Sequence, residues 1–253
     1  MKFHHHPVDY YVQRLQNKEH FAFPGYSDAE WFCILGHDTH KTTGQGQQLD
    51  DATGRRLLRI IKRRWRDPRF LFAVPECMWH LADFQTAEIP NNIEKILNKN
   101  AINVEFYERD MVLDELAEHA GLAPWIRQLR KMRAVMIGNA HLREIDFLRI
   151  QRFIEIPPVN LHLDEAAMSD VINQAKDING VQVFLFSAGI ASAILIDGIA
   201  DHQPNSSLID CGSIWDAFVG IGRQREWRRK LYKDPEAHRR WLDANLLTIG
   251  AKQ

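Results

Sequence analysis

Two carboxylates stand one residue apart near the amino terminus of this 253-residue chain, at a spacing that could hold a metal ion. Asp28 and Glu30 follow a Pro-Gly turn, and we expect a helix to begin at Ser27 or Asp28. Neighbouring carboxylates can bind one divalent ion together with diphosphate oxygens, and such hard ligands suit Mn²⁺ or Mg²⁺. The same Ser-Asp-x-Glu pattern is also typical of a helix N-cap with acidic residues in its first turn. The pattern therefore leaves both metal binding and helix capping open.

Three loops in the second half of the chain share small and polar residues that directly follow an apolar run. They are Gly138-Asn139, Ser187-Ala188-Gly189, and Asp210-Cys211-Gly212-Ser213 with Asp216 shortly after. Small residues let a ligand approach the backbone, and free N–H groups at a helix N-terminus suit a phosphate. Ordinary strand–turn–helix junctions use the same residue types. Three such loops together favour a nucleotide-type pocket, whereas the absence of GxGxxG and GxxxxGK[ST] argues against dinucleotide dehydrogenases and P-loop NTPases.

Short apolar runs alternate with longer segments of helical spacing along the chain. The strand candidates are 70–74, 102–107, 134–137, 153–156, 181–186 and 207–209. The helix candidates are 50–65, 92–97, 112–119, 124–132, 164–178 and 188–200. This alternation predicts a Rossmann-like α/β fold, with an open, mostly parallel sheet and helices on both faces. Ligands of such sheets bind at the carboxyl ends of the strands, which is where the three loops fall.

Composition is that of an ordinary globular chain, with 45% hydrophobic and 26% charged residues. We expect a single α/β domain over 1–253, with a basic helical carboxy-terminal extension from about residue 221. Cys33, Cys77 and Cys211 are odd in number and widely spaced, which favours free thiols in the cytoplasm. We find no signal peptide and no apolar run long enough to span a bilayer.

Two segments are strongly basic although the formal net charge is only −1. Residues 55–69 carry seven Arg and one Lys against one Asp, and residues 223–240 carry six Arg and two Lys against two Glu and one Asp. Such segments are typical of solvated helix faces, but they could also hold a polyanion.

Zinc binding by His37 and His40 is disfavoured because no Cys or third His accompanies them. Their loop, which also holds Asp38, could be a lid. His4, His5 and His6 cannot all face one ion, so we do not expect them to bind a metal.

The segment Gly25–Trp31 resembles the RFGDGE-type motif that opens the GT-D-type glycosyltransferases. The blocks 135–139, 183–189 and 208–216 follow in the order and approximate spacing of that family, so the resemblance covers roughly residues 20–220. This chain departs from the motif at Phe23-Pro24, in place of the family's arginine, and at Ala29, in place of a glycine. Ser213 stands where many relatives have a histidine.

The resemblance implies a metal-dependent glycosyltransferase whose donor is a nucleotide-sugar, most simply a UDP-sugar. Asp28 and Glu30 would hold the metal, and Asp210 and Asp216 are candidate bases. The implied donor-binding residues are Gly25, Gly138, Asn139, Ser187, Ala188, Gly189, Gly212 and Ser213. The acceptor hydroxyl could belong to a glycan, a glycoprotein or a hydroxylated base in DNA held by the basic segments.

Two other classes remain open at this stage. The basic segments could belong to a non-catalytic nucleic-acid-binding protein, although no zinc finger, RRM signature or clear helix-turn-helix is visible. A nucleotide hydrolase or methyltransferase of Rossmann-like fold is also possible. That reading is disfavoured because the acidic triplet precedes every predicted strand, whereas such enzymes usually place their acids after strands.

Overall fold

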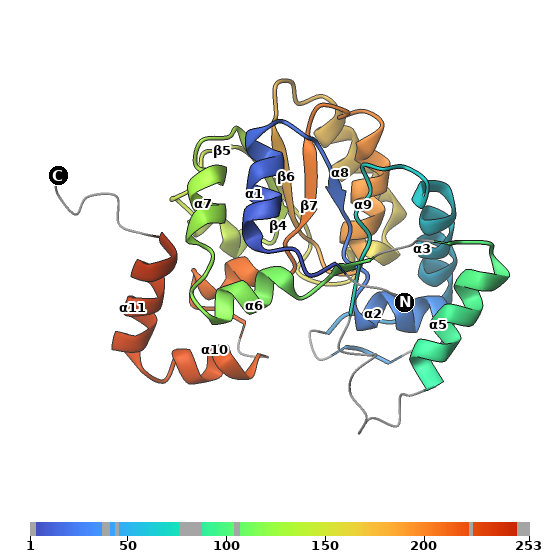
Figure 1. The fold of residues 1–253 in the computed structure, drawn as a ribbon, viewed down its shortest axis with the longest axis horizontal. Helices are drawn as coiled ribbons and strands as arrows, with labels where there is room; N and C mark the ends of the chain where they lie inside the picture. Colours follow the sequence, from blue (N-terminus) through green and yellow to red (C-terminus); the bar gives the residue numbers. More distant parts are fainter. Residues whose placement is uncertain are drawn as a thin grey trace.

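The computed structural model describes residues 4–36, 41–43, 46–75, 88–103, 107–222 and 225–246, with only the backbone path for 88–90. It confirms the predicted α/β architecture (Figure 1). Five parallel strands form one sheet in the order β1-β7-β6-β4-β5. They are β1 (Ala22–Phe23), β4 (Ala134–Gly138), β5 (Ile150–Glu155), β6 (Val183–Ser187) and β7 (Ser207–Asp210).

The central strands are buried on both faces, which explains why their sequences are continuous apolar runs. In β4, Val135 and Ile137 pack into the hydrophobic cluster on one face, whereas Ala134 and Met136 pack into the cluster on the other. The register Ala134↔Val183 and Val183↔Ser207 aligns the ends of β4, β6 and β7. The loops that follow these strands therefore meet at one edge of the sheet.

Helices cover both faces of the sheet, as Figure 1 shows. One face carries α2 (Asp28–Leu35), α3 (Asp51–Arg64), α5 (Glu88–Lys99), α8 (Glu165–Lys176) and α9 (Ala191–Ala200). The other carries α1 (Val8–Gln16), α6 (Val112–Glu118), α7 (Ala123–Leu129), α10 (Glu226–Leu231) and α11 (Pro235–Leu246). Short 3₁₀ helices lie at η1 (Ala140–Glu144), η2 (Leu161–Leu163) and η3 (Ile214–Ala217). No helix among the described residues is long and apolar enough to cross a bilayer.

Helix α11 is packed onto the domain. The Trp241 indole N–H donates to the carbonyl of Ala117 at the end of α6, and the side chain of Asn245 accepts from the N–H of Leu122 at 3.0 Å. Both side chains are buried. The basic segment from residue 225 onward is thereby fixed against α6 and α7.

Strand β1 was missed by the sequence analysis, and its position changes one argument. Only Ala22 and Phe23 form the strand, too short a run to stand out before the Pro-Gly turn, yet they pair with Leu208 and Ile209 of β7. The acidic triplet thus follows a strand and does not precede them all. The position of the triplet therefore does not disfavour other Rossmann-like enzymes, and the prediction that it precedes every strand is wrong.

A second, two-stranded parallel sheet joins β2 (Ala73–Val74) to β3 (Glu108–Arg109). The predicted strand 70–74 is shorter than expected, although Phe70 and Ala73 form isolated bridges with Ala22 and Gly25. Strand β3 lies just beyond the predicted run 102–107, of which 104–106 fall outside the described residues. This small sheet extends the edge formed by β1 and carries Asp110 toward Ser27.

Close packing between α2 and α3 holds the helix that carries the acidic triplet. Gly54 of α3 lies so near α2 that a Cβ atom there would stand 1.9 Å from the carbonyl oxygen of Cys33. Asp50 caps α3 by accepting from the N–H of Thr53 at 2.7 Å. The carboxy-terminal half of α2 is therefore held against α3 by close backbone packing.

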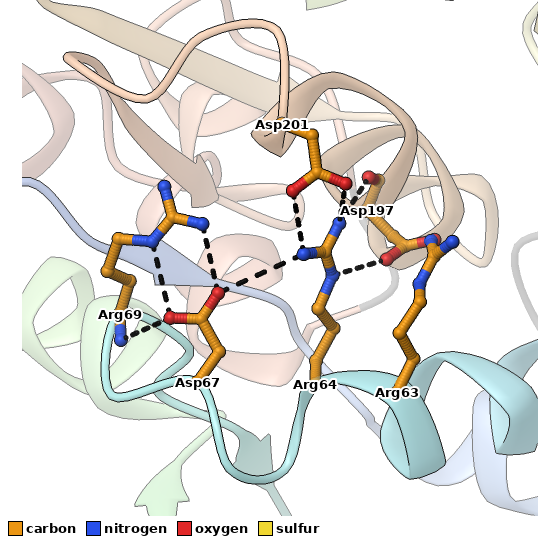
Figure 2. Close-up of polar contacts among 6 residues, drawn as sticks. All are labelled: Arg63, Arg64, Asp67, Arg69, Asp197 and Asp201. Carbon is orange, nitrogen blue, oxygen red and sulfur yellow. Dashed lines mark hydrogen bonds and ion pairs between the residues drawn. The ribbon is translucent and has the colours of Figure 1, made fainter.

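Three arginines of the first basic segment pair with aspartates, as Figure 2 shows. Arg64 donates to Asp197 of α9 at 2.9 Å and to Asp201 at 2.7 Å. Arg63 pairs with the same Asp197, and Arg69 pairs with Asp67 at 2.9 Å. Arg63 and Arg64 thereby join α3 to α9, whereas Arg69 holds the turn after α3.

Replacing Asp197 by Ala is expected to destabilise the protein by about 3 kcal/mol, because it removes the buried carboxylate that Arg63 and Arg64 share and leaves the buried Arg64 to rely chiefly on the mostly exposed Asp201. Arg64 and Asp197 are each only 7% exposed. The matched change Asp201→Ala removes a carboxylate that is mostly exposed and should cost under about 1 kcal/mol. Urea unfolding measures the free energy of unfolding of both variants. Equal losses would show that the burial of Asp197 does not make its ion pairs more stabilising than those of Asp201.

Candidate active site

A cleft of about 450 Å³ lies at the carboxyl edge of the five-stranded sheet. The loops after all five strands line it. Ten of the twelve site residues predicted from the sequence lie in its wall: Asp28, Glu30, Asn139, Ser187, Ala188, Gly189, Asp210, Gly212, Ser213 and Asp216. The other two, Gly25 and Gly138, lie directly behind the wall. A cleft of this size is within the range that holds small ligands and cofactors.

The acidic triplet opens α2, whose N-cap residue is Ser27. Glu30 is 5% exposed; its carboxylate accepts backbone N–H bonds from Ser27 and from Glu30 itself, and its Oε2 has no hydrogen-bond partner among the described residues. The exposed Asp28 accepts from the N–H of Ala29 at 2.9 Å. The Ser27 hydroxyl donates to Asp110 at 2.9 Å and accepts no capping bond from the N–H groups of the helix. Helix capping therefore uses only part of the triplet.

Asp210 ends β7 beside the triplet and is held by three donors. It accepts from the N–H of Gly212 at 2.9 Å, and it also accepts from the N–H of Gly25 and the hydroxyl of Ser192. A Cβ atom at Gly25 would stand 2.7 Å from Asp210 Oδ2, so only glycine lets the chain pass this carboxylate. Gly25 therefore positions Asp210.

Carboxylates crowd this end of the cleft, and their pKa values rise as a result. Burial, and after it the charge of Asp210, raise the pKa of Glu30 to about 8. Burial likewise raises the pKa of Asp210 to about 7, with Asp110 adding to the effect. Burial and the nearby Asp28 raise the pKa of Asp110 to about 6, and its Oδ1 has no partner among the described residues. The cluster holds more negative charge than its surroundings compensate, which favours a bound cation.

Without metal, the protein is expected to lose stability as the pH rises from about 5 to 8. The pKa of Glu30 is higher in the folded state than its usual 4.5, so the folded state keeps a proton that the unfolded chain releases. This costs up to about 1.4 kcal/mol per pH unit for one group. Glu30→Gln should flatten the slope and stabilise the metal-free protein at pH 8.

Urea unfolding at pH 5.5 and pH 8 in the presence of a chelator tests this expectation. Glu165→Gln is the matched control, because Glu165 is an exposed first-turn acid of α8 outside the cleft. Parallel pH slopes for the wild type and Glu30→Gln would contradict the expectation.

The loop after β6 differs in part from the predicted phosphate site. Helix α9 begins at Ala191, three residues later than expected, because Gly189 takes a left-handed φ of +55°. The N–H of Ile190 donates to Gln47 Oε1 at 3.1 Å, and that of Ala188 donates to the Ser192 hydroxyl at 3.3 Å. Two amide groups expected to be free thus have protein partners. A phosphate at this loop would have to displace the Gln47 side chain.

The loop after β4 presents Asn139 to the cleft, where its amide donates to the carbonyl of Pro158 at 3.5 Å. Gly138 lies behind it, and a Cβ atom there would stand 2.8 Å from Leu142. Ser187 of β6 donates to the carbonyl of Gly212 at 2.6 Å, which joins two of the predicted loops. The side chain of Asn139 is therefore held at the wall formed by the loop after β5.

Asp216 of η3 stands at the other end of the cleft beside a histidine that the sequence analysis missed. His141 Nε2 lies 3.1 Å from Asp216 Oδ1. Arg228 stands behind them, 1% exposed, and donates to Asp114 at 3.0 Å and to Ser213 at 3.1 Å. Asp216 and His141 are both partly exposed in the cleft, and this arrangement can accept a proton from a bound hydroxyl.

Asp110, His141 and Arg225 are among the residues at or beside the cleft that were not predicted. Asp110 follows β3 and His141 follows β4 by three residues, so a wider search after each strand would have found both. Arg225 Nε lies 3.6 Å from Asp114 Oδ2. Thr43 and Gln47, which also line the cleft, belong to the Gly/Gln-rich loop predicted as a lid. The predicted lid residues His37, Asp38 and His40 and the thiol of Cys77 lie outside the described residues, whereas Cys33 and Cys211 are free and buried.

The open parallel sheet with a carboxylate-lined cleft at its carboxyl edge places the chain among α/β proteins of glycosyltransferase-like fold. Two solved structures share this fold over 92% of the chain and 82% of their own length, each with a TM-score of 0.57. One, 14% identical, is a selenomethionine-substituted domain of unknown function 1792. The other, 13% identical, is the same domain, described as highly conserved and as having a distinct glycosyltransferase fold.

At these identities the likeness concerns the fold alone. No protein family model matches the chain, and no curated protein matches it by sequence. Activity must therefore be argued from the cleft.

Proposed function

We propose that the chain is a metal-dependent glycosyltransferase of the GT-D type, which moves a sugar from a UDP-sugar to a hydroxyl acceptor. The observation that carries the proposal is the carboxylate cluster of Glu30, Asp28 and Asp210 at the carboxyl edge of a glycosyltransferase-like sheet. The acidic triplet, to which the family resemblance assigned the metal, lines the same cleft as the three nucleotide-type loops.

The residues present fit a hard divalent cation, Mn²⁺ or Mg²⁺. Glu30 Oε2 is a buried carboxylate oxygen without a partner among the described residues, and Asp28 stands exposed one residue away in the cleft wall. No three carboxylates of this cleft bring their oxygens within 4.8 Å of one another in the described part of the chain. This supports a cation shared with substrate, because Mg²⁺ and its relatives commonly use one or two carboxylates plus substrate phosphates.

The residues on each side of the cleft would have separate roles in the transfer. A bound cation would offset the negative charge that builds on the leaving diphosphate. Asn139 and the Ser187–Gly189 loop would bind the nucleoside and phosphates, with Gln47 yielding its bonds to the loop. Asp210, held by three donors, fixes the wall between the triplet and this loop.

Asp216 and His141 would take the proton from the acceptor hydroxyl. They lie in the cleft with the triplet, and Arg228 and Ser213 form a fixed layer behind Asp216. A positioned acid–base group of this kind typically contributes about 10²–10⁴-fold to a rate.

A glycan or glycoprotein acceptor is favoured over DNA. Arg63, Arg64 and Arg69 pair with aspartates, and the buried Arg228 pairs with Asp114. These pairs engage four of the arginines that motivated a nucleic-acid partner, catalytic or not. We keep the cytoplasm as the proposed compartment on the basis of cysteine usage.

Incubation with Mn²⁺ and a panel of nucleotide-sugars tests the proposal. Release of UDP from one UDP-sugar, and its loss when a chelator is added, is the expected result. A protein that consumes no nucleotide-sugar and is stabilised by none, with or without metal, would overturn the assignment.

A further inference from the structure

A second cluster of metal-ligand side chains lies outside the cleft, at the amino terminus. His4, His6 and Glu108 each offer a ligand atom, and these atoms lie within 4.8 Å of one another. None of the three lines the cleft. Among the described residues this is the one group of three or more His, Cys, Asp or Glu side chains with such spacing.

The backbone explains why two of the three consecutive histidines face the same way. The N–H of His4 donates to the carbonyl of Tyr107 at 2.8 Å, which joins this segment to the chain just before β3. Side chains along an extended chain alternate between opposite sides. His4 and His6 accordingly lie on one side, partly buried and with their rings stacked at 4.4 Å, whereas His5 is exposed. Three consecutive histidines were not expected to face one ion, and His5 indeed stands outside the group. What the sequence analysis overlooked is that His4 and His6 could combine with Glu108, which is distant in the sequence.

Glu108 completes the group from β3. Its side chain is 3% exposed, and Oε1 lies 3.8 Å from His6 Nε2. The other oxygen accepts from the Tyr11 hydroxyl, which orients the carboxylate as outer-shell partners orient metal ligands. The His6 ring also stacks on Tyr10 at 3.7 Å, which limits its rotation.

We propose that His4, His6 and Glu108 form a Zn²⁺ site that ties the amino-terminal segment to β3, with water as the fourth ligand. Two imidazoles and one carboxylate form a known zinc ligand set. Bonds of about 2.0–2.2 Å in a tetrahedral site place ligand atoms about 3.3–3.6 Å apart. The observed spacing reaches that value through small side-chain rotations. The site is independent of the cation proposed for the cleft.

Calorimetric titration of the full chain with Zn²⁺ tests the site. The wild type should bind one equivalent, and His4→Ala, His6→Ala and Glu108→Gln should each weaken binding at least tenfold. His5→Ala is the matched control, because it removes the exposed neighbour of the same type, and it should bind as the wild type does. Glu30→Gln should also keep this site, which separates it from the cleft.

Co²⁺ substitution supplies a second readout that does not depend on the buried Glu108 variant folding well. The wild type should show the intense visible absorption of four-coordinate Co²⁺, and His4→Ala should lose it. A wild type that binds no Zn²⁺ would overturn the proposal. So would equal weakening by His5→Ala and His4→Ala, which would indicate adventitious chelation by a histidine-rich terminus.

Discussion

Glu30→Gln is expected to lower metal-dependent sugar transfer on the order of 100- to 1,000-fold, and Asp28→Asn should have a comparable effect. Glutamine keeps the shape of Glu30 and its bonds to backbone N–H groups, so the fold should survive. What it removes is the negative charge on an oxygen that has no protein partner among the described residues. Metal-free stability at pH 8 should rise in the same variant, so activity and stability should change in opposite directions.

Turnover of the purified variants with Mn²⁺ and the preferred UDP-sugar measures this effect. Glu165→Gln again serves as control, since it removes a first-turn acid of another helix and should leave turnover unchanged. Near-normal turnover in both Asp28→Asn and Glu30→Gln would show that the triplet only caps α2.

Asp216→Asn is expected to lower kcat by about 10²–10⁴-fold with a smaller change in KM, because it removes the acid–base group and spares the donor site. His141→Ala should reduce kcat as well, since His141 Nε2 lies 3.1 Å from Asp216 Oδ1 in the same cleft. Expressed as a free energy, the loss of kcat in the double variant should be smaller than the sum of the two single losses, because the residues act as one unit.

His202→Ala is the control for the histidine change, because His202 is exposed in the loop before β7, away from the cleft. Initial rates at saturating donor and varied acceptor separate the kcat effect from the KM effect. Wild-type kcat in both Asp216→Asn and His141→Ala would remove this pair from the mechanism.

The sequence was informative where chemistry is local. Asp28 and Glu30 are adjacent on one helix turn, and each predicted loop directly follows a buried strand, so spacing and the carboxyl-edge rule located ten of the cleft's residues. The central strands and α3, α7 and α8 were also predictable, because each combines a long apolar pattern with a clear end signal.

Long-range packing explains what was missed. Asp110 reaches Ser27 only because β3 pairs with β2, which is bridged to the chain after β1. The two-residue β1 has no periodicity of its own and is defined by its pairing with β7. Gln47 contacts Gly189 across 142 positions in the sequence, a contact that a single sequence does not predict. The pairing of Arg63 and Arg64 in residues 55–69 could not be predicted either, since their aspartate partners lie on and just beyond α9.

Calorimetric titration of UDP into the wild type and Glu30→Gln, each with and without Mn²⁺, is the most direct test of the central claim. The account predicts that the wild type binds UDP tightly only with Mn²⁺ present, and that Glu30→Gln loses this metal-dependent gain. Equal UDP affinity in all four titrations would contradict it.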